Sequence, residues 1–399
     1  MRGMVQIKPV LESSFVCLQD GEKIHGDAIC WQGIHVGAII KDATGQDWLF
    51  RDLPIGHSAH WRYEVNLQSK QLTGPRGVEW LSVPLLESLT NPTQGEVLLK
   101  REVFRETKDV IILNCLDMMY GHSLLKLLNA SRHLADNPER GLILLIPAFL
   151  RWLIPEGISE VWTVPLGLKA MKGFYRSLDL QIQSFCDDYD SIWLSEAFSH
   201  PSRFRIQDYT RVLPHDFTGE ENLVTFVWRE DRLWLPHYPA KKLRKAGLLS
   251  LGLAWQKLKI IRLFSKIRER FPETRFAVAG LGVEGRFPEW VEDCRVAEFD
   301  AGTEETAARL YAESRIVIGV HGSNMLLPSG LAGMTVDLMP EDKWQCLPED
   351  VLFQEPDPRM ASFRYRFIPA SSGPVSTAEV AESMLQQFRT IPVFLKEDF

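Results

Sequence analysis

The sequence predicts an α/β protein built from two Rossmann-like domains. The chain has 399 residues, and a single hydrophobic core seldom grows beyond about 250–300 residues. From residue 110 onward, short apolar runs alternate with longer stretches of helical periodicity. That alternation is typical of parallel strands joined by helices, which cover both faces of a doubly wound sheet.

The first 100 residues have a different pattern. Short strand-like runs at 15–18, 38–40 and 48–50 are separated by turn residues. We therefore predict a β-rich entry segment at 1–100. No apolar stretch of the kind that marks a secretory signal follows the N-terminus, which favours a cytoplasmic protein.

Four buried strands and a helix are expected in the rest of the first domain. The strands are at 110–113, 142–146, 161–164 and 191–194, and the helix is at 124–134. The most apolar stretch of the chain is GLILLIPAFLRWLIP at 141–155. A bilayer-spanning helix needs about 20 apolar residues, so we expect a buried strand followed by a short helix here. A peripheral membrane contact through this stretch is the alternative.

A linker is predicted at 198–217, which is rich in Pro, Ser, His and Arg and lacks periodicity. The first domain then covers 1–217 and the second covers 218–375. The strands expected in the second domain are 222–228, 275–279, 295–299, 315–320 and 335–339. Helices are expected at 248–270 and after Thr303. A final helix within 376–399 is expected to pack back on the first domain.

Charge and cysteine usage exclude several classes of function. The net charge of −7 gives no electrostatic footprint for nucleic acid. The six cysteines are scattered and form no C-x-x-C pair, so neither a zinc site nor a disulfide framework is indicated. Reduced thiols again suit a cytoplasmic protein.

The sharpest candidate site follows the expected strand at 315–320. The chain continues there through His321, a tight turn at Gly322 and a helix start. Ligands of open α/β sheets bind at the carboxyl ends of the strands, and a helix start favours an anion. Gly322 lets a phosphate approach the backbone, Ser323 and Asn324 add donors, and a hydrogen bond or positive charge can come from the histidine. An ordinary strand-to-helix turn with a capping Ser is the alternative.

Two arginines follow the first strand of the same domain. Arg229 and Arg232 come directly after that strand, with Glu230 and Asp231 between them. Arginine suits bidentate recognition of phosphate, although a surface salt-bridge cluster is the alternative. Strand order in a doubly wound sheet would place this strand end beside the glycine turn, so we expect both segments to share one diphosphate.

The segment RIVIGVHGSNMLLPSGLAGMTVDLMP at 315–340 resembles the C-terminal signature of the family 61 glycosyltransferases. The family pattern is an apolar strand, G-x-H-G-A, a later Asn, a small-residue stretch and an apolar strand ending in Glu and Pro. The chain matches at Gly319, His321, Gly322, Asn324, Pro328, Gly330 and Pro340. It departs at Ser323, where Ala is usual, at Asn324, which comes early, and at Asp337, where Glu is common.

Two other segments are similar to the family. The arginines at 229 and 232 match its strand followed by arginines, and MYGHSLL at 119–125 resembles its N-domain segment that opens a helix. The resemblance covers residues 110–340 and is specific mainly at 315–340. The first 100 residues match no family that we can place.

The resemblance implies a GT-B fold, in which two Rossmann-like domains face a cleft. It also implies an inverting transfer from a nucleotide sugar, with a UDP-sugar favoured, to a hydroxyl of a glycan or protein. Residues 1–217 would then be the acceptor-side domain and 218–375 the nucleotide-sugar-binding domain. Related bacterial chains are associated with surface polysaccharides, which points to polysaccharide biosynthesis in the cytoplasm.

An inverting transfer needs a base for the acceptor proton and positive charge for the leaving diphosphate. His122, at the start of a helix after the first buried strand, is the first candidate for the base, and Asp117 is the second. A helix-capping or core histidine is the alternative. The arginines and the glycine turn would serve the diphosphate, so no metal or other cofactor is required. Thr303 and Glu304 are assigned to the nucleotide, with a solvated helix N-terminus as the alternative.

A rival motif lies in the first domain. Asp188-Tyr189-Asp190 is a D-x-D, the motif with which GT-A enzymes hold a divalent metal and a diphosphate. That interpretation needs an apolar strand at 181–186, which the sequence only half supports. An acidic loop without a metal is the alternative.

Two questions stay open at this stage. Trp234 and Trp344 follow apolar strands and are candidates for stacking on a sugar or base, although most tryptophans are expected in the core. A non-catalytic nucleotide- or glycan-binding protein and another GT-B-like transferase, such as a pyruvyl transferase, remain as alternative functions.

Overall fold

The computed structural model of the protein describes residues 3–11, 14–16, 23–26, 28–42, 44–197, 201, 203–346, 352 and 364–388. The chain divides into two compact units, Met1–Phe204 (unit 1) and Arg205–Phe399 (unit 2). The division falls inside the predicted linker at 198–217. That linker also holds a short helix, α5 (Ile206–Thr210).

Unit 1 is built on a six-stranded sheet whose four central strands are parallel. In spatial order they are β13 (Ser191–Ser195), β10 (Asp109–Asn114), β11 (Gly141–Pro147) and β12 (Glu160–Val164). The edge strands β1 (Met4–Lys8) and β9 (Lys100–Val103) run antiparallel to their neighbours. All four strands predicted from apolar runs are present. Their near-complete burial is what a parallel sheet covered on both faces requires.

The most apolar stretch of the chain forms β11 and the 3-10 helix η2 (Ala148–Leu153). The predicted strand followed by a short helix is therefore confirmed. Every residue of β11 is buried within the sheet, so the alternative of a membrane contact through this strand is wrong. Among the described residues, no helix combines the length and apolarity needed to cross a bilayer.

Helices connect the parallel strands of unit 1. They are α2 (Tyr120–Leu127), α3 (Ala130–Asp136), the 3-10 helix η3 (Ala170–Lys172) and α4 (Arg176–Cys186). The single helix predicted at 124–134 is thus two helices. Asn129 lies at the break, where its Nδ2 donates to the Leu125 carbonyl at 2.9 Å. A side chain of this kind competes with the backbone bonds of a helix.

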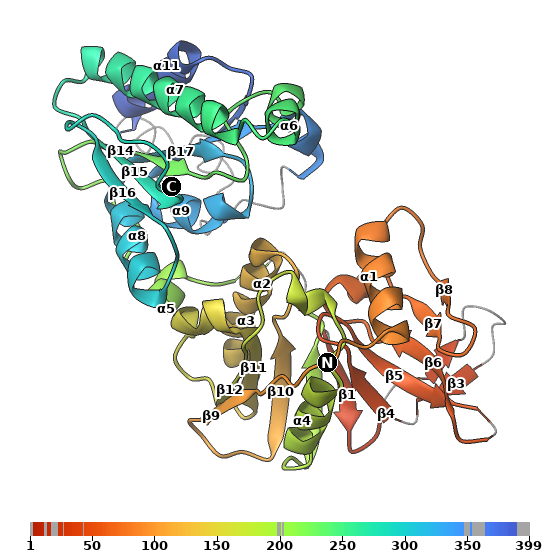
Figure 1. Ribbon diagram of the computed structural model, residues 1–399. Helices are drawn as coiled ribbons and strands as arrows, with labels where there is room; N and C mark the ends of the chain where they lie inside the picture. Colours follow the sequence, from red (N-terminus) through yellow and green to blue (C-terminus); the bar gives the residue numbers. More distant parts are fainter. Residues whose placement is uncertain are drawn as a thin grey trace, which may run out of the picture. The chain divides into compact units, whose positions relative to one another are not determined.

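The predicted β-rich entry segment is confirmed (Figure 1). Its antiparallel sheet runs in the order β4 (Ala28–Trp31), β5 (Val36–Lys41), β6 (Asp47–Asp52), β7 (Glu64–Asn66) and β8 (Gln71–Thr73). The 3-10 helix η1 (Gly56–Ala59) lies between β6 and β7, α1 (Glu79–Thr90) follows β8, and β2 (Ser14–Val16) pairs with β3 (Lys23–His25). Buried side chains of the antiparallel and parallel sheets share one core.

Unit 2 is a six-stranded, wholly parallel sheet. Its spatial order is β16 (Glu292–Val296), β15 (Arg275–Leu281), β14 (Leu223–Trp228), β17 (Ile316–Val320), β18 (Met334–Met339) and β19 (Tyr365–Pro369). Its longer helices are α6 (His237–Lys245), α7 (Leu249–Arg270), α8 (Ala301–Glu313) and α11 (Pro374–Gln387). Short elements η4 (Ser323–Met325), α9 (Leu326–Leu331) and η5 (Glu341–Cys346) follow β17 and β18.

Several elements of unit 2 differ from the prediction. The strand expected at 295–299 lies earlier, as β16, and α6 and β19 were not predicted. Helix α8 begins at Ala301, because Asp300 is its cap. Thr303 N donates to Asp300 Oδ1 at 2.8 Å, and Asp300 N donates to Thr303 Oγ1 at 2.8 Å. Thr303 is therefore the third helical residue of a capping box.

The C-terminal helix packs within its own unit. Helix α11 lies beside α7 in Figure 1, and an ion pair of 3.4 Å joins Arg270 to Glu382. The expected packing of this helix on the first domain stays a prediction. Residues 389–399 lie outside the described residues.

Both units share one strand order. Numbered along the chain, the parallel strands of unit 1 lie in the order 3-2-1-4, and those of unit 2 in the order 3-2-1-4-5-6. This is the Rossmann order, whose switch point lies between the first and fourth strands. The predicted α/β class, with a Rossmann-like parallel sheet in each of two domains as in a GT-B protein, is confirmed for each unit by itself.

Candidate functional site

The switch point of unit 2 brings together the arginines and the glycine turn predicted from the sequence. Arg229 and Arg232 follow β14, and the loop 321–324 follows β17, the adjacent parallel strand. We call these residues the arginine crevice. Arg232 Nη1 donates to the His321 carbonyl, and Arg229 Nη1 donates to Asn324 Oδ1. The two strand ends therefore meet as the strand order predicted.

Gly322 leaves the space that both guanidinium groups occupy. Its φ is +146°, a conformation that favours glycine. A Cβ atom at this position would lie 2.6 Å from Arg229 Nη1 and 2.9 Å from Arg232 Nη1. The missing side chain thus lets two positive charges gather at one turn of the backbone.

Part of the salt-bridge alternative is also correct. Arg229 forms a bidentate pair with Asp231, with Nε to Oδ1 at 2.7 Å and Nη2 to Oδ2 at 2.5 Å. Burial raises the pKa of Asp231, but the hydrogen bond and charge of Arg229 outweigh it, and the pKa lies below its usual value. The Arg229 side chain is 12% exposed and that of Asp231 is 71% exposed. An anion that enters the crevice therefore has to compete with a solvated carboxylate, which is a weak competitor.

The His321 ring is held by the neighbouring strand. It is buried, and its Nδ1 lies 2.9 Å from Asp337 Oδ2 on β18. Tyr365 on β19 donates to the same carboxylate oxygen at 2.9 Å. The backbone carbonyl of His321 receives the guanidinium groups, and its ring ties the turn to β18. The predicted role of the ring as a donor to the ligand stays a prediction.

The other residues assigned to the donor have mixed positions. Ser323 and Asn324 begin the short helix η4, and no side chain caps it, so the predicted capping role of Ser323 is wrong. Asn324 Nδ2 is buried and has no hydrogen-bond partner among the described residues. The Thr303 hydroxyl accepts a hydrogen bond from Asp300 N in the cap of α8, and Glu304 lies in the first turn of that helix. A nucleotide role for these two residues stays a prediction.

The switch point of unit 1 holds both predicted base candidates. Asp117 follows β10, and His122 lies in the first turn of α2. His122 Nδ1 lies 3.3 Å from Asp117 Oδ1. Sequence reasoning placed the two residues near one strand end, and the structure brings their side chains into contact.

Two further side chains complete this group, which we call the histidine cluster: His57, Asp117, His122 and Lys126. His57 Nε2 lies 2.9 Å from Asp117 Oδ2 and 3.1 Å from His122 Nδ1. Lys126 Nζ donates to Asp117 Oδ2 at 2.8 Å and to the Leu116 carbonyl at 2.9 Å. Asp117 and Lys126 are almost wholly buried, whereas His122 is 18% exposed.

Burial and charge set the protonation of the cluster. Burial raises the pKa of Asp117, but the Lys126 charge and hydrogen bonds from both histidines outweigh it, and the pKa lies well below its usual value. Burial lowers the pKa of His57 to about 4, against the hydrogen bond to Asp117, which raises it. At neutral pH the cluster therefore contains an ionised carboxylate, an ammonium and a neutral His57.

The β-rich entry segment contributes side chains to this site that no sequence motif indicates. His57 lies in η1, and Trp61 and Trp80 from the same segment place their rings 6.4 and 5.3 Å from the His57 ring. The Trp80 ring is also 6.0 Å from that of His122. Positive φ at Gly56, +52°, turns the chain into this position. A Cβ there would lie 3.3 Å from Lys126 Cε.

The histidine cluster is also the group among the described residues whose ligand atoms are arranged to hold a metal. Two nitrogens and one carboxylate oxygen, as in His57, His122 and Asp117, suit zinc. However, Lys126 already places a positive charge against the third ligand at 2.8 Å. A divalent cation bound there would face that ammonium, so we assign the cluster to proton chemistry.

The D-x-D motif lies at the wrong end of its strand. Residues 187–190 precede β13, at the amino edge of the sheet, and the segment that should have been a strand is helix α4. Asp188 pairs with Arg101 at 2.5 Å, and the Tyr189 ring is buried. The metal interpretation is therefore not supported by its structural context.

The tryptophan candidates differ. Trp234 is fully buried and stacks on Phe226, with ring centroids 5.8 Å apart, so its assignment to ligand stacking is wrong. Trp344 is 41% exposed in η5 and stays available for contacts with a ligand.

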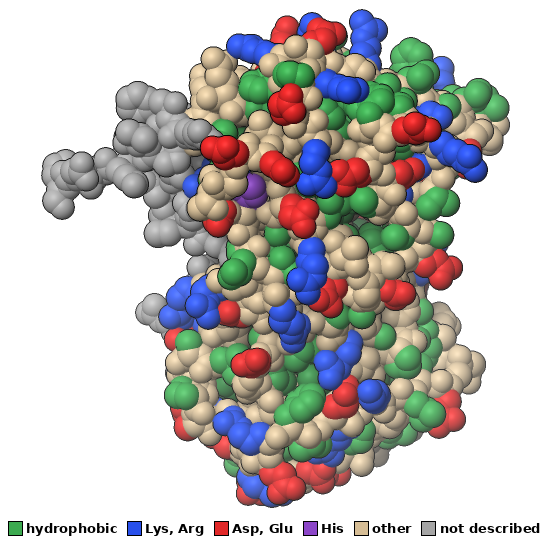
Figure 2. All heavy atoms as spheres, turned by 90° about the vertical axis from the view of Figure 1, so that its left-hand side faces the viewer, with side chains coloured by type: hydrophobic (Ala, Val, Ile, Leu, Met, Phe, Trp, Pro, Cys, Tyr) green, Lys and Arg blue, Asp and Glu red, His purple; other side chains and the backbone are tan. Residues whose placement is uncertain are grey.

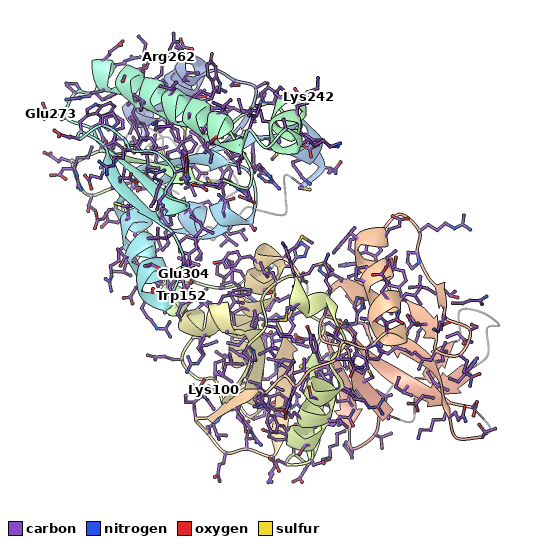
Figure 3. All side chains as sticks on the ribbon, viewed as in Figure 1. Lys100, Trp152, Lys242, Arg262, Glu273 and Glu304 are labelled. Atoms are coloured by element: carbon purple, nitrogen blue, oxygen red, sulfur yellow. The ribbon has the colours of Figure 1, made fainter. Side chains whose placement is uncertain are left out.

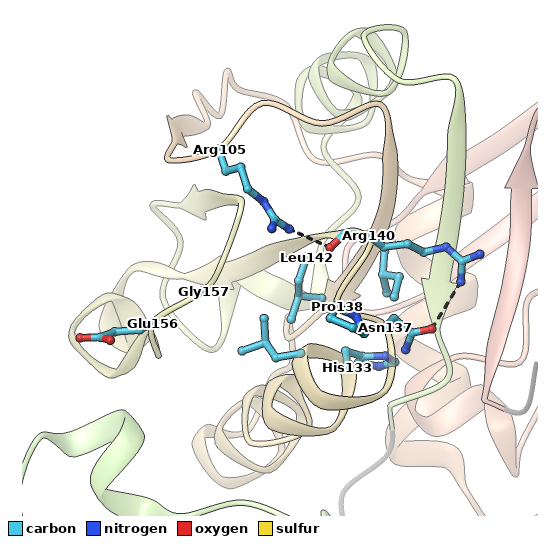
Figure 4. Close-up of a pocket in the computed structure, with 10 residues that line it drawn as sticks. Arg105, His133, Asn137, Pro138, Arg140, Leu142, Glu156 and Gly157 are labelled. Atoms are coloured by element: carbon cyan, nitrogen blue, oxygen red, sulfur yellow. Dashed lines mark hydrogen bonds between the residues drawn. The ribbon is translucent and has the colours of Figure 1, made fainter.

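Unit 1 also has a small cavity whose arginines are already bonded within the protein. It has a volume of about 260 Å³ and lies at the amino end of β11 (Figure 4). Arg105 Nη2 donates to the Arg140 carbonyl at 2.9 Å, and Arg140 Nε pairs with Asp109 at 2.9 Å. Both arginines are engaged, and the cavity is on the edge opposite to the one where ligands of such sheets bind.

Comparison with known proteins gives distant structural likenesses. No protein-family model matches the chain, and no curated protein matches its sequence. A putative UDP-N-acetylglucosamine 2-epimerase from Listeria monocytogenes is 10% identical over 71% of this chain and 67% of that one, with a TM-score of 0.31. A TarM mutant from S. aureus in complex with fondaparinux, alpha-GlcNAc-glycerol and UDP is 10% identical over 94% and 66%, with a TM-score of 0.24.

KpsC, a beta Kdo 2,4 transferase from Thermosulfurimonas dismutans, is 12% identical over 43% of this chain and 49% of that one, with a TM-score of 0.20. The chain thus spans between 49% and 67% of these three proteins. Likenesses this low carry no argument about function, which therefore has to come from the arginine crevice and the histidine cluster.

Proposed function

We propose that this protein is an inverting glycosyltransferase that moves a sugar from a nucleotide sugar, with a UDP-sugar favoured, to a hydroxyl of a glycan or protein. One observation carries the proposal. Each unit has a Rossmann switch point, and the two switch points hold complementary chemistry: fixed positive charge in unit 2 and a proton acceptor in unit 1.

The arginine crevice is suited to the diphosphate of the donor. Arg229 and Arg232 present guanidinium groups beside a turn that has no side chain at Gly322. A planar guanidinium binds two phosphate oxygens at once and stays protonated at every physiological pH. As the sugar leaves, negative charge grows on the diphosphate oxygen, and these groups stabilise it without rearranging.

The histidine cluster is suited to deprotonate the acceptor. His122 is its most exposed imidazole, and with its Nδ1 proton directed at Asp117, Nε2 carries the lone pair of a base. The acceptor O–H bond breaks as its proton passes to Nε2, and the oxygen forms a bond to the anomeric carbon. The bond from that carbon to the diphosphate breaks, and its electron pair stays on the diphosphate. Asp117 stabilises the imidazolium that results.

The proposed reaction takes its positive charge from arginine and needs no metal. A helix terminus contributes little here, because η4 and α9 are short. Trp344 is an exposed aromatic of unit 2 that could stack on the donor base.

The test is turnover with a donor panel. The full chain is incubated with UDP-, GDP-, ADP- and CMP-sugars and simple glycan acceptors in EDTA, and the nucleotide released and the anomeric configuration of the product are measured. We expect release of one nucleotide and an inverted product. His122→Ala should lose about a hundredfold or more in kcat, whereas His60→Ala, at an exposed histidine that follows η1, should not.

Other outcomes would replace the proposal. Nucleotide binding without turnover of any donor would indicate a non-catalytic nucleotide- or glycan-binding protein. Turnover with phosphoenolpyruvate in place of a sugar nucleotide would indicate a pyruvyl transferase. A retained configuration at the anomeric carbon would overturn the inverting mechanism and the role of His122.

A further inference from the structure

Helix α7 and its N-cap residue Leu248 expose large apolar side chains on the side that faces away from their own unit. Leu248, Leu251, Trp255 and Leu258 are 44%, 59%, 55% and 57% exposed. Their spacing of three and four residues places them in one stripe along the helix. The face that packs into unit 2 carries other residues: Gly252, Leu253, Gln256, Ile260, Leu263 and Phe264. A surface helix of a globular protein ordinarily has polar residues opposite its buried face, and this apolar stripe departs from that pattern.

The stripe lies in the most basic part of the chain. Between Asp231 and Glu269 the sequence has no acidic residue, and residues 241–268 contain nine lysines and arginines. The whole chain has a net charge of −7, so the segment opposes the overall charge. On the face drawn in Figure 2, by contrast, acidic and basic side chains are interspersed.

The cations around the stripe are directed to solvent. Lys241, Lys245 and Arg262 are exposed and form no ion pair with any residue in the described part of the chain. Lys242 and Arg262 extend outward from α6 and α7 in Figure 3. The α6–α7 surface is our name for the four apolar residues of the stripe together with the cations Lys241, Lys242, Lys245 and Arg262. Leucine and tryptophan flanked by lysine and arginine are the composition of helices that lie in the interface of an anionic bilayer.

We propose that the α6–α7 surface binds the headgroup region of an anionic lipid bilayer and holds the protein at a membrane as a peripheral protein. Charge complementarity selects this occupant. The lysines and arginines attract acidic headgroups, and the leucines and tryptophan enter the boundary between headgroups and acyl chains. An apolar protein partner would leave exposed cations such as Lys241, Lys245 and Arg262 unmatched, and a second copy would have to bring the same positive charge against them.

The surface is tied to the arginine crevice within unit 2. Gln256, next to Trp255, donates through Nε2 to the Arg229 carbonyl at 3.1 Å and accepts from Trp234 N at 2.6 Å. Lys259 donates to the Trp234 carbonyl at 3.1 Å. Membrane binding would therefore hold the Arg229 segment close to the bilayer. The proposal goes beyond the proposed function and does not depend on it.

The experiment is cosedimentation of the full chain with vesicles. We expect binding to vesicles of equal parts phosphatidylglycerol and phosphatidylcholine, release by high salt, and no binding to phosphatidylcholine alone. Trp255→Glu with Leu258→Glu should weaken binding by about tenfold or more. The matched control is Leu180→Glu on α4 of unit 1, where the leucine is 55% exposed, and it should bind normally.

A second pair of variants separates charge from apolar contact. Lys241→Gln with Lys245→Gln should weaken binding to the anionic vesicles by about tenfold, whereas Lys169→Gln with Lys172→Gln in unit 1 should not. Circular dichroism checks that each variant is folded, and stabilisation by UDP checks the arginine crevice separately.

Three results would overturn the proposal. The first is failure of the parent chain to bind either vesicle. The second is equal weakening in the test and control variants. The third is a dimer in solution that Trp255→Glu with Leu258→Glu converts to a monomer, because a second copy would then be the occupant.

Discussion

The two switch points have the same place in the sheet order and opposite chemistry. In unit 2 the loop after the first strand contributes two permanently charged guanidinium groups, and the loop after the fourth strand contributes the glycine turn that they contact. In unit 1 the corresponding edge holds two imidazoles, a carboxylate and an ammonium, which are coupled and partly titratable. The strand order fixes where chemistry can occur, and the loops decide which chemistry it is.

The difference also lies in how each site is assembled. The arginine crevice comes from the ends of two adjacent parallel strands, as in the contact of Arg229 with the His321 carbonyl. The histidine cluster needs a third contributor, because His57 reaches it from the β-rich entry segment. A site with fixed charge can be built on the sheet alone, whereas the buried cluster also needs a cover that excludes water.

The largest expected effect comes from breaking the buried cluster. Asp117→Asn removes the carboxylate that neutralises Lys126, whose side chain is 2% exposed. An unpaired buried charge costs about 3–5 kcal/mol in the free energy of unfolding. Urea denaturation measures the loss. The control is Asp136→Asn, at an exposed pair with Arg203 of 2.6 Å, for which we expect less than about 1 kcal/mol. Equal losses in the two variants would contradict the account of the cluster.

Acid should lower the stability of unit 1 because His133 gains a proton on unfolding. The arginines of unit 2 have no such pH dependence, because they are permanently charged. Burial lowers the pKa of His133 to about 4, and its Nε2 lies 2.6 Å from Ser195 Oγ. Between an ordinary value of about 6.5 and this value the unfolded chain binds more protons, so stability rises with pH and is lost as pH falls through this window. The loss is on the order of 3 kcal/mol.

Urea denaturation at a series of pH values from 7 to about 4 checks this dependence. His133→Gln cannot gain the proton, and its free energy of unfolding should fall less steeply over the same window. A slope identical to that of the parent chain would mean that His133 does not titrate as described.

In unit 2 the sharpest change is Gly322→Ala. The added Cβ displaces the guanidinium groups of Arg229 and Arg232 and strains a backbone with φ of +146°. We expect about a tenfold weaker affinity for UDP, measured by calorimetry on the folded variant. Gly219→Ala is the control, because nothing lies within 4 Å of its Cβ position. Unchanged affinity for UDP in Gly322→Ala would mean that the glycine has no part in binding.

The smallest effect is expected at the D-x-D motif. Asp188→Asn breaks an exposed pair with Arg101, whose loss should cost less than about 1 kcal/mol of stability. UDP affinity in the presence of Mn²⁺ should stay the same, because the motif is at the amino edge of its sheet. A drop in affinity that appears only with Mn²⁺ would revive the metal interpretation.

Parts of this architecture follow from sequence because their signals are local. The central strands are continuous apolar runs, and parallel pairing then places Arg229 beside Gly322 by topology alone. The base candidates Asp117 and His122 were identified for the same reason, since both follow a buried strand directly.

Other features depend on tertiary packing that the order of the parallel strands does not set. His57 contacts Asp117 across 60 residues, and no pattern near His57 reveals the contact. The orientation of the His321 ring depends on Asp337 in the next strand, whose carboxylate holds the ring inward. Trp234 follows a strand, as a cleft residue would, but the turn after β14 folds it onto Phe226. In each case tertiary contacts decide which way a side chain faces.

The central claim is that the arginine crevice binds a diphosphate without a metal. It is tested most directly by thermal unfolding with UDP or uridine in EDTA, on the parent chain and on Arg229→Ala. A ligand that binds only the folded state raises the melting temperature. We expect UDP to stabilise the parent chain, uridine to have little effect, and Arg229→Ala to lose the response to UDP, while Arg275→Ala at an exposed pair on β15 keeps it. Stabilisation by uridine equal to that by UDP, or an undiminished response in Arg229→Ala, would contradict the claim.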